Sequence, residues 1–153
     1  MLKPGQIAPD FSVLSTKGET VSLHSLKGKR LVMFFFPKAF TTGCTLEVRA
    51  FQKAYPLFLA QQAEVIGISV DSQETQCEFA KQEQVSFPMI ADESKTLSKL
   101  YDTLWPIIRK NRRVTYIIET DGRISACFSF ELNAEKHIQE TLDFLRKTSA
   151  QLG

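Results

Sequence analysis

The apolar run at 31–36 constrains the fold of this chain more than any other feature, because a helical pattern follows it at once. Every residue from Leu31 to Phe36 is apolar, which is typical of a strand buried on both faces of a sheet. Apolar residues then recur three and four positions apart and predict a helix over 44–60: Val48, Phe51, Tyr55 and Phe58. Pro56 lies inside this stretch and is expected to kink the helix. A buried strand that leads directly into a helix indicates an α/β fold.

The rest of the chain alternates between strand-like and helix-like segments. Short apolar runs bounded by turn residues predict further strands at 11–14, 20–23, 65–70, 87–90, 114–118 and 124–130. Helices are predicted over 73–84, capped by Asp71 or Ser72, and after Asn133, with one apolar stripe: Ile138, Leu142 and Leu145. The sequence contains no linker or repeat, so residues 1–153 are expected to form a single domain with a three-layer α/β/α sandwich.

Composition excludes several classes of function. The chain has 153 residues, 43% of them hydrophobic with twelve Phe, and is long enough to bury a core. A formal net charge of +2 is too small to indicate a nucleic-acid partner. The sequence holds no apolar run long enough for a membrane span, so no membrane partner is expected. The basic cluster of Arg109, Lys110 and Arg112 is interpreted as part of a solvated loop.

Cysteine usage predicts a reducing compartment. Three cysteines at wide spacing, an odd number, do not resemble a disulfide framework. Met1 to Gly5 lacks the apolar core of a secretion signal, so nothing points to export. The expected location is therefore the cytoplasm.

Cys44 falls just after the buried strand, in the first turn of the predicted helix. Thr41, Thr42 and Gly43 precede it and supply the capping chemistry expected at a helix start. A helix N-terminus offers unpaired backbone N–H groups and a positive dipole end, and both favour a thiolate over a thiol. We interpret Cys44 as a placed nucleophile.

The segment around Cys44 resembles the active-site motif of the peroxiredoxins, within them the bacterioferritin-comigratory (Q-type) group. The motif Pro-x-x-x-Thr/Ser-x-x-Cys is matched by Pro37, Thr41 and Cys44, and Glu47 stands where the family carries an acidic residue. Three further blocks resemble the family in the same order along the chain: Gly5 to Phe11, Val65 to Ser72, and Arg113 to Gly122. The likeness therefore covers nearly the whole chain.

This resemblance implies a fold and an activity. It implies a thioredoxin-like fold with the peroxiredoxin N-terminal extension. The implied activity is a thiol-dependent peroxidase that reduces hydrogen peroxide and organic hydroperoxides through a sulfenic acid on Cys44. Thioredoxin or a low-molecular-weight thiol would recycle the enzyme, which needs no cofactor and would be a monomer or a homodimer.

Peroxide reduction needs more than an acidic thiol. Lowering a thiol's pKa from about 8.5 to about 6 raises the thiolate fraction near neutral pH only some ten- to thirty-fold, or roughly 1.5–2 kcal/mol. Enzymatic accelerations commonly require at least about 8 kcal/mol, so donors that hold and polarise the peroxide must supply most of the effect.

The family resemblance implies which residues supply these contacts. It implies that the Thr41 hydroxyl and the backbone N–H groups of Gly43 and Cys44 bond the peroxide, and that Pro37 shields the sulfur from water. It also implies that Arg113 stabilises both the thiolate and the peroxide, and that Glu47 orients this arginine. Among these residues only the arginine has a close competitor, because Arg112 is adjacent; counting from the strand 114–118 favours Arg113.

The recycling route is left open by the sequence. Arg49 stands where many Q-type relatives carry a resolving cysteine, and Ala80 stands at the other common position. Cys77 lies one helical turn before Ala80, so it is a candidate resolving cysteine beside a one-cysteine mechanism with an external thiol. Cys127 is interpreted as a small apolar strand residue.

Two other functions are alternatives to the peroxidase. A thiol–disulfide oxidoreductase needs Cys-x-x-Cys, but Thr41 occupies the first position here. A redox-sensing or interaction module, in which oxidation of Cys44 alters the binding of a partner, remains an alternative. His24 and His137 have no ligand-like spacing to the cysteines, so neither a role nor a metal is assigned to them.

Overall fold

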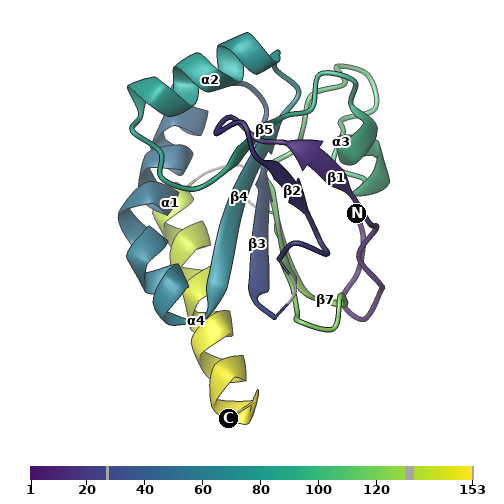
Figure 1. The fold of residues 1–153 in the computed structure, drawn as a ribbon, viewed down its shortest axis with the longest axis vertical. Helices are drawn as coiled ribbons and strands as arrows, with labels where there is room; N and C mark the ends of the chain where they lie inside the picture. Colours follow the sequence, from purple (N-terminus) through teal and green to yellow (C-terminus); the bar gives the residue numbers. More distant parts are fainter. Residues whose placement is uncertain (27, 130–132, 153) are drawn as a thin grey trace.

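A mixed five-stranded sheet forms the centre of the protein (Figure 1). The computed structural model describes residues 1–26, 28–129 and 133–152. The strand order is β5-β4-β3-β6-β7, with these bounds: β3 Arg30–Phe35, β4 Ala63–Ser69, β5 Met89–Ala91, β6 Val114–Ile118 and β7 Ile124–Ser129. β3 pairs in parallel with β4 and antiparallel with β6, so it occupies the middle of the sheet. Its burial at every position confirms the expectation from its apolar sequence.

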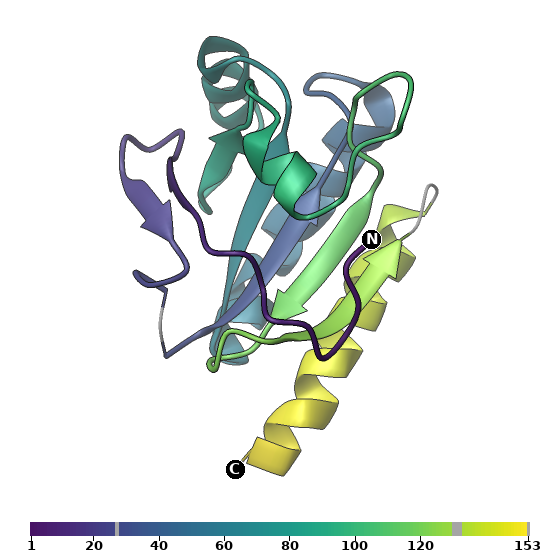
Figure 2. The same cartoon turned by 90° about the vertical axis from the view of Figure 1, so that its right-hand side faces the viewer.

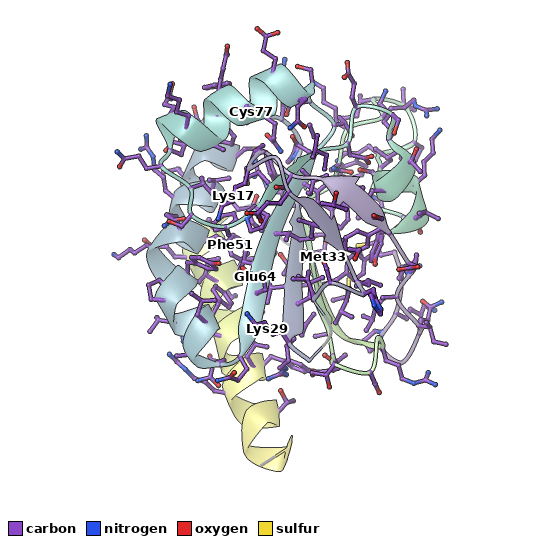
Figure 3. All side chains as sticks on the ribbon, in the orientation of Figure 1. Lys17, Lys29, Met33, Phe51, Glu64 and Cys77 are labelled. Atoms are coloured by element: carbon purple, nitrogen blue, oxygen red, sulfur yellow. The ribbon has the colours of Figure 1, made fainter. Side chains whose placement is uncertain are left out.

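Two long helices cover one face of the sheet. They are α1, Thr42–Ala60, and α4, Ala134–Leu152, which pack against each other and against the sheet (Figure 1). Phenylalanines fill this layer: the rings of Phe34 and Phe51 stack with centroids 4.0 Å apart, and Phe58 stacks on Phe51. Figure 3 shows Phe51 on the α1 side of the sheet.

The N-terminal segment covers the opposite face. It runs across the sheet and forms a hairpin of β1, Ser12–Leu14, and β2, Thr20–Ser22, beside the short helix α3, Thr96–Leu100 (Figure 2). Phe11 contacts Tyr101 here, Tyr101 packs on Tyr116 of β6, and the Tyr101 hydroxyl donates to the carbonyl of Pro9. The three-layer α/β architecture is confirmed, although this third layer is built largely of extended chain.

The helix α2, Gln73–Gln82, lies across the end of the sheet beside β5 (Figure 1). Ser72 is its N-cap and accepts a hydrogen bond from the backbone N–H of Thr75, which decides between the two caps that the sequence allowed. Asn133 likewise accepts from the N–H of Lys136 at the start of α4, as predicted.

Several element bounds differ from the sequence-based expectations. The strand expected at 87–90 is Met89–Ala91, and the helix expected to reach residue 84 ends at Gln82. The sequence analysis missed α3, whose five residues are too few to show a helical period. Pro56 lies inside α1, which continues to Ala60. The predicted end of the last strand, Phe130, lies outside the described residues. Among the described residues, no helix is long and apolar enough to cross a membrane.

Candidate active site

The turn between β3 and α1 places Cys44 at the end of the sheet. Cys44 is fully buried in the first turn of α1. Asp71, which follows β4, holds this turn: its Oδ2 accepts from the backbone N–H of Ala39 at 2.8 Å and from the Ser69 hydroxyl at 2.6 Å. Phe40 adopts a left-handed backbone with φ of 66° and packs its ring against Phe79. The turn is thus fixed from both sides and carries backbone strain next to the cysteine.

Thr41 is the N-cap residue of α1, as its position predicts, but its side chain does not act as the cap. Its hydroxyl donates to the carbonyl of Lys38 at 2.8 Å. The backbone N–H groups of Gly43 and Cys44 belong to the first helical turn, where the helix itself provides no acceptor. The Thr41 oxygen retains lone pairs that can accept a hydrogen bond. Donors and an acceptor therefore lie together at the helix start.

Arg113 approaches the same turn from the start of β6. Its Nη1 donates to Glu47 Oε1 at 2.9 Å, and Glu47, one turn after Cys44, is buried. A Cβ on Gly43 would lie 2.5 Å from Arg113 Nη2, so only glycine leaves room for the guanidinium at this position. The structure therefore brings together Cys44, Gly43, Glu47 and Arg113.

The charge on Arg113 is stabilised by its neighbours. Burial opposes the charge, but the Cys44 sulfur and the Glu47 carboxylate outweigh burial and raise the pKa of Arg113 above its usual value. A permanent cation therefore faces the sulfur and can stabilise negative charge there.

Arg112 points elsewhere. Its guanidinium lies over the ring of Trp105, 4.7 Å from the ring centroid. Arg112 and Arg113 precede β6 and face different neighbours, which agrees with the choice of Arg113 as the arginine near Cys44.

The other two cysteines lie in different surroundings. Cys77 is half-buried on α2, where its Sγ is 3.9 Å from the Thr16 carbonyl oxygen in the β1–β2 turn and 3.6 Å from Gln73 Nε2. Figure 3 shows it above the turn that holds Lys17. Burial raises the pKa of the Cys127 thiol on β7. All three cysteines are free thiols.

Two residues near the site were missed by the sequence analysis. Asp71 stands at the carboxyl end of β4, the same edge of the sheet as Cys44, and this shared edge is a signal that could have found it. His137 is buried, bonds to the Thr115 hydroxyl and packs edge-on against Phe51. Burial, assisted by the charge of Arg113, lowers the pKa of His137 to about 4. Its position on the inward stripe of α4 beside Ile138 could have predicted its burial.

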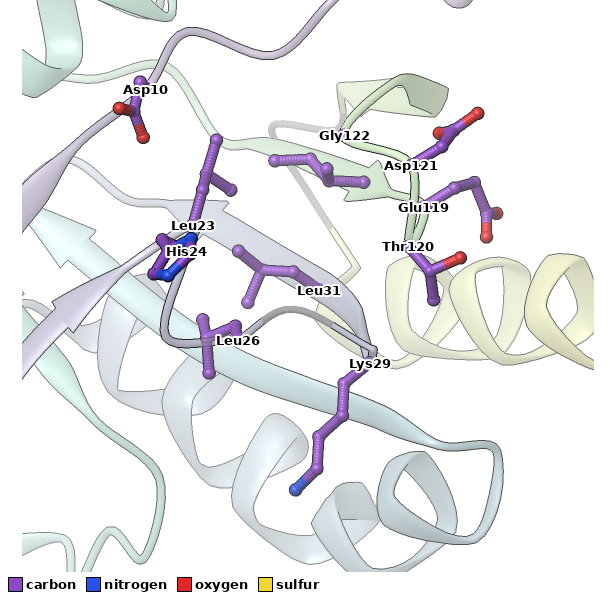
Figure 4. Close-up of a pocket in the computed structure, with 11 residues that line it drawn as sticks. Asp10, Leu23, His24, Leu26, Lys29, Leu31, Glu119, Thr120, Asp121 and Gly122 are labelled. Carbon is purple, nitrogen blue, oxygen red and sulfur yellow. The ribbon is translucent and has the colours of Figure 1, made fainter.

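A separate cavity lies at the other end of β3 (Figure 4). It has a volume of about 300 Å³, and its lining includes Leu23, His24, Leu31, Ile118 and Asp121. Leu31 is near the start of β3, whereas Cys44 follows the end of that strand. Among the described residues, no group of three His, Cys, Asp or Glu side chains could hold a metal ion, here or near Cys44.

Comparisons with known proteins bear on this site. Residues 4–127 match the family model described as AhpC/TSA family. The chain is 35% identical over 149 residues to the chloroplastic peroxiredoxin Q of Sedum lineare, covering 93% of this chain and 77% of that protein. It is 33% identical over 150 residues to the putative peroxiredoxin bcp of Helicobacter pylori, covering 94% of this chain and 98% of that protein. The crystal structure of peroxidoxin BcpB from Mycobacterium tuberculosis superposes with a TM-score of 0.89 at 27% identity. The match covers 96% of this chain and 98% of that chain.

Proposed function

Because the chain belongs to the AhpC/TSA family and is a thiol-dependent peroxidase of the peroxiredoxin class, we propose that Cys44 is the residue that reduces the peroxide. The Cys44 thiolate attacks one peroxide oxygen, the O–O bond breaks, and the departing oxygen takes up a proton and leaves as water or an alcohol. The sulfur is oxidised to a sulfenic acid. Two thiol groups of a reductant then reduce the sulfenic acid to the thiol, and in doing so they form a disulfide with each other and release water.

The contact between Arg113 and the first turn of α1 carries this proposal. The guanidinium fills the space that a side chain at position 43 would take and lies beside the Cys44 sulfur. Arg113 therefore stabilises the attacking thiolate and the charge that develops on the departing oxygen. Glu47 acts as a positioning residue, because its bond to Nη1 leaves Nη2 directed at the helix start.

The remaining residues of the turn bind the peroxide. Backbone N–H groups of Gly43 and Cys44 donate to a peroxide oxygen. The Thr41 hydroxyl already donates to Lys38, so Thr41 accepts the hydrogen of the peroxide O–H group. Pro37, half-buried before the turn, shields the thiolate from water.

We further propose that an external thiol, either thioredoxin or a small thiol, recycles Cys44 in a one-cysteine mechanism. The Cys77 sulfur faces the β1–β2 turn through Thr16. A disulfide needs close Cα atoms and side chains that point toward each other, so a link to Cys44 would require the Cys77 sulfur to leave its contact with Thr16. We place the chain in the cytoplasm as a single domain, either monomeric or homodimeric, a proposal supported by its likeness to bcp over 98% of that protein and by its free thiols.

The test is peroxide consumption by the purified protein with dithiothreitol as reductant. Cys44→Ser should abolish turnover while keeping the far-ultraviolet circular dichroism, because a serine hydroxyl is barely ionised at neutral pH. Cys127→Ser, a matched control on β7, should consume peroxide normally. Near-normal consumption by Cys44→Ser would refute the assignment of Cys44.

A further inference from the structure

A turn next to the Cys44 site exposes large apolar side chains. We call residues 105–110 the Trp105 turn. Ile107 is 92% exposed, Ile108 62% and Trp105 38%. Contiguous exposed residues of this size commonly mark an interaction surface.

The backbone holds the Trp105 turn in a fixed conformation. The N–H of Trp105 donates to the Lys110 carbonyl at 2.9 Å, and the N–H of Arg109 donates to the Trp105 carbonyl at 3.1 Å. At its base the Thr103 hydroxyl donates to Asn111 Oδ1 at 2.7 Å, within the protein interior. The two isoleucines therefore stand at the tip of an ordered turn, and their exposure is a property of the fold.

The charge around the turn has one sign. Arg109 and Lys110 are exposed, Arg112 lies over the Trp105 ring, and the sequence 103–113 contains no Asp or Glu. The preceding carboxylate, Asp102, is paired with the N-terminal amine at 2.8 Å. A second copy of this turn would bring like charges together, so an isologous contact between two copies is disfavoured. The complementary partner is an anionic surface.

We propose that the Trp105 turn docks onto the surface of a lipid bilayer that contains anionic lipids. Aliphatic side chains at the tip enter the boundary between headgroups and acyl chains, and tryptophan is favoured at this depth. Arg109 and Lys110 contact anionic headgroups. The sequence-based expectation of no membrane partner rested on the lack of a spanning segment, and surface docking does not require one.

Docking would place the active site at the lipid surface. Arg113 lies three residues after the turn in the sequence, and its guanidinium lies at the start of α1 beside Cys44. In Figure 2 the loop projects from the same end of the sheet at which α1 starts.

The test uses the intrinsic fluorescence of the protein, because Trp105 is the single tryptophan of the chain. Vesicles of phosphatidylcholine mixed with phosphatidylglycerol should shift its emission to shorter wavelength and carry the protein down on sedimentation. Vesicles of phosphatidylcholine alone should bind far less, and added salt should weaken binding to the mixed vesicles.

Paired variants separate the two contributions. Ile107→Ser with Ile108→Ser should weaken partitioning by about tenfold or more. Arg109→Gln with Lys110→Gln should weaken it by about thirtyfold. The matched controls are Leu57→Ser with Leu59→Ser, exposed on α1, and Arg146→Gln with Lys147→Gln, exposed on α4; both should bind as the unchanged chain does.

These measurements distinguish failure of the docking proposal from failure of the peroxidase assignment. Vesicle binding is measured without peroxide, and hydrogen peroxide turnover is measured without vesicles. An emission spectrum unchanged by anionic vesicles, together with unchanged sedimentation, would overturn the docking proposal. Loss of vesicle binding equally in the controls, or self-association abolished by the isoleucine pair without vesicle binding, would also overturn it.

Discussion

Two arginine–glutamate pairs lie at opposite ends of the central strand β3, and they use the same chemistry differently. At its start, Arg30 donates to both carboxylate oxygens of Glu119, at 2.9 and 2.8 Å, and its Nη1 donates to the Leu145 carbonyl at 2.9 Å. At the other end, Arg113 bonds Glu47 through Nη1 and directs Nη2 at the start of α1. Arg30 has 4% of its side chain exposed and Arg113 17%.

The difference separates an ion pair that serves structure from one for which we propose a role in the chemistry. Arg30 donates to the carbonyl of Leu145 in α4 and to the carboxylate of Glu119 in the β6–β7 turn. These hydrogen bonds link β3 to both segments. Arg113 bonds Glu47 through Nη1, and in the proposed mechanism Nη2 serves the sulfur and the peroxide. An arginine with a donor directed at a reacting group is suited to stabilise charge on that group.

The largest expected effects come from breaking each pair. Arg113→Ala should lower the second-order rate with peroxide by about a hundredfold or more, since it removes a donor to the reacting oxygens. Arg30→Ala should leave that rate close to normal and lower the free energy of unfolding by about 3 kcal/mol, because it removes the ion-pair partner of Glu119. The measurements are stopped-flow peroxide kinetics and urea unfolding of both variants.

Arg112→Ala is the control for the first of these changes. Its guanidinium lies on Trp105, so its loss should change the peroxide rate little. A larger rate loss in Arg112→Ala than in Arg113→Ala would show that the wrong arginine was assigned. A rate in Arg113→Ala that recovers fully at raised pH would show that the arginine affects only ionisation of the thiol.

A second prediction concerns the buried histidine beside the Arg113 pair. Its pKa falls from an ordinary 6.5 to about 4 on folding, through burial and then the charge of Arg113. The unfolded chain therefore binds the proton first, and stability is lost as the pH falls from about 6.5 to about 4, by about 3 kcal/mol in all. Above this window His137 is neutral in both states, so its contribution is constant.

Urea unfolding across this pH range measures the effect. His137→Asn should flatten the pH dependence, whereas His24→Asn, at an exposed histidine, should leave it unchanged. Parallel pH dependences in the unchanged chain and in His137→Asn would contradict the conclusion that burial and the charge of Arg113 lower the pKa of His137.

Much of the fold and part of the site could be predicted from the sequence, because both depend on local patterns. The apolar strand 31–36 and the helix start at Cys44 are encoded by adjacent residues. Contacts across the chain were harder to find: Asp71 bonds Ala39 from another turn, and His137 reaches Thr115 from the last helix. The sequence shows that such residues are polar, but the tertiary packing sets which partners they bond.

The Thr41 hydroxyl shows the same limit at closer range. The sequence identified Thr41 as a helix cap by position, and it is the N-cap residue. Its hydroxyl turns back to Lys38 instead, a rotamer choice that residue type does not determine. The family resemblance identified Arg113 and Glu47 as partners, whereas the missing Cβ at Gly43 that admits the guanidinium became visible in the structure.

A third prediction concerns the space that Gly43 leaves for the Arg113 guanidinium. Gly43→Ala places a Cβ 2.5 Å from Nη2, so the guanidinium must move while the helix persists. The peroxide rate should fall roughly tenfold, because the donor is displaced from its productive position. Thr42→Ala, on the same exposed turn, should keep the normal rate. An unchanged rate in Gly43→Ala would mean that the Arg113 position is not critical.

The smallest effect is expected at Cys77, which lies on α2 at the same end of the sheet as the Arg113 pair but turns its sulfur toward Thr16. Because the Cys77 sulfur would have to leave its contact with Thr16 to reach Cys44, Cys77→Ser should retain turnover with a small-thiol reductant. Under excess peroxide and without reductant, Cys44 should accumulate as sulfenic and then sulfinic acid, seen by intact mass. A loss of two hydrogens with a Cys44–Cys77 linked peptide in the unchanged chain, and loss of thioredoxin-dependent turnover in Cys77→Ser, would replace the one-cysteine mechanism. In that case the end of the sheet that holds Arg113 would open during each cycle, whereas the end held by Arg30 would stay closed.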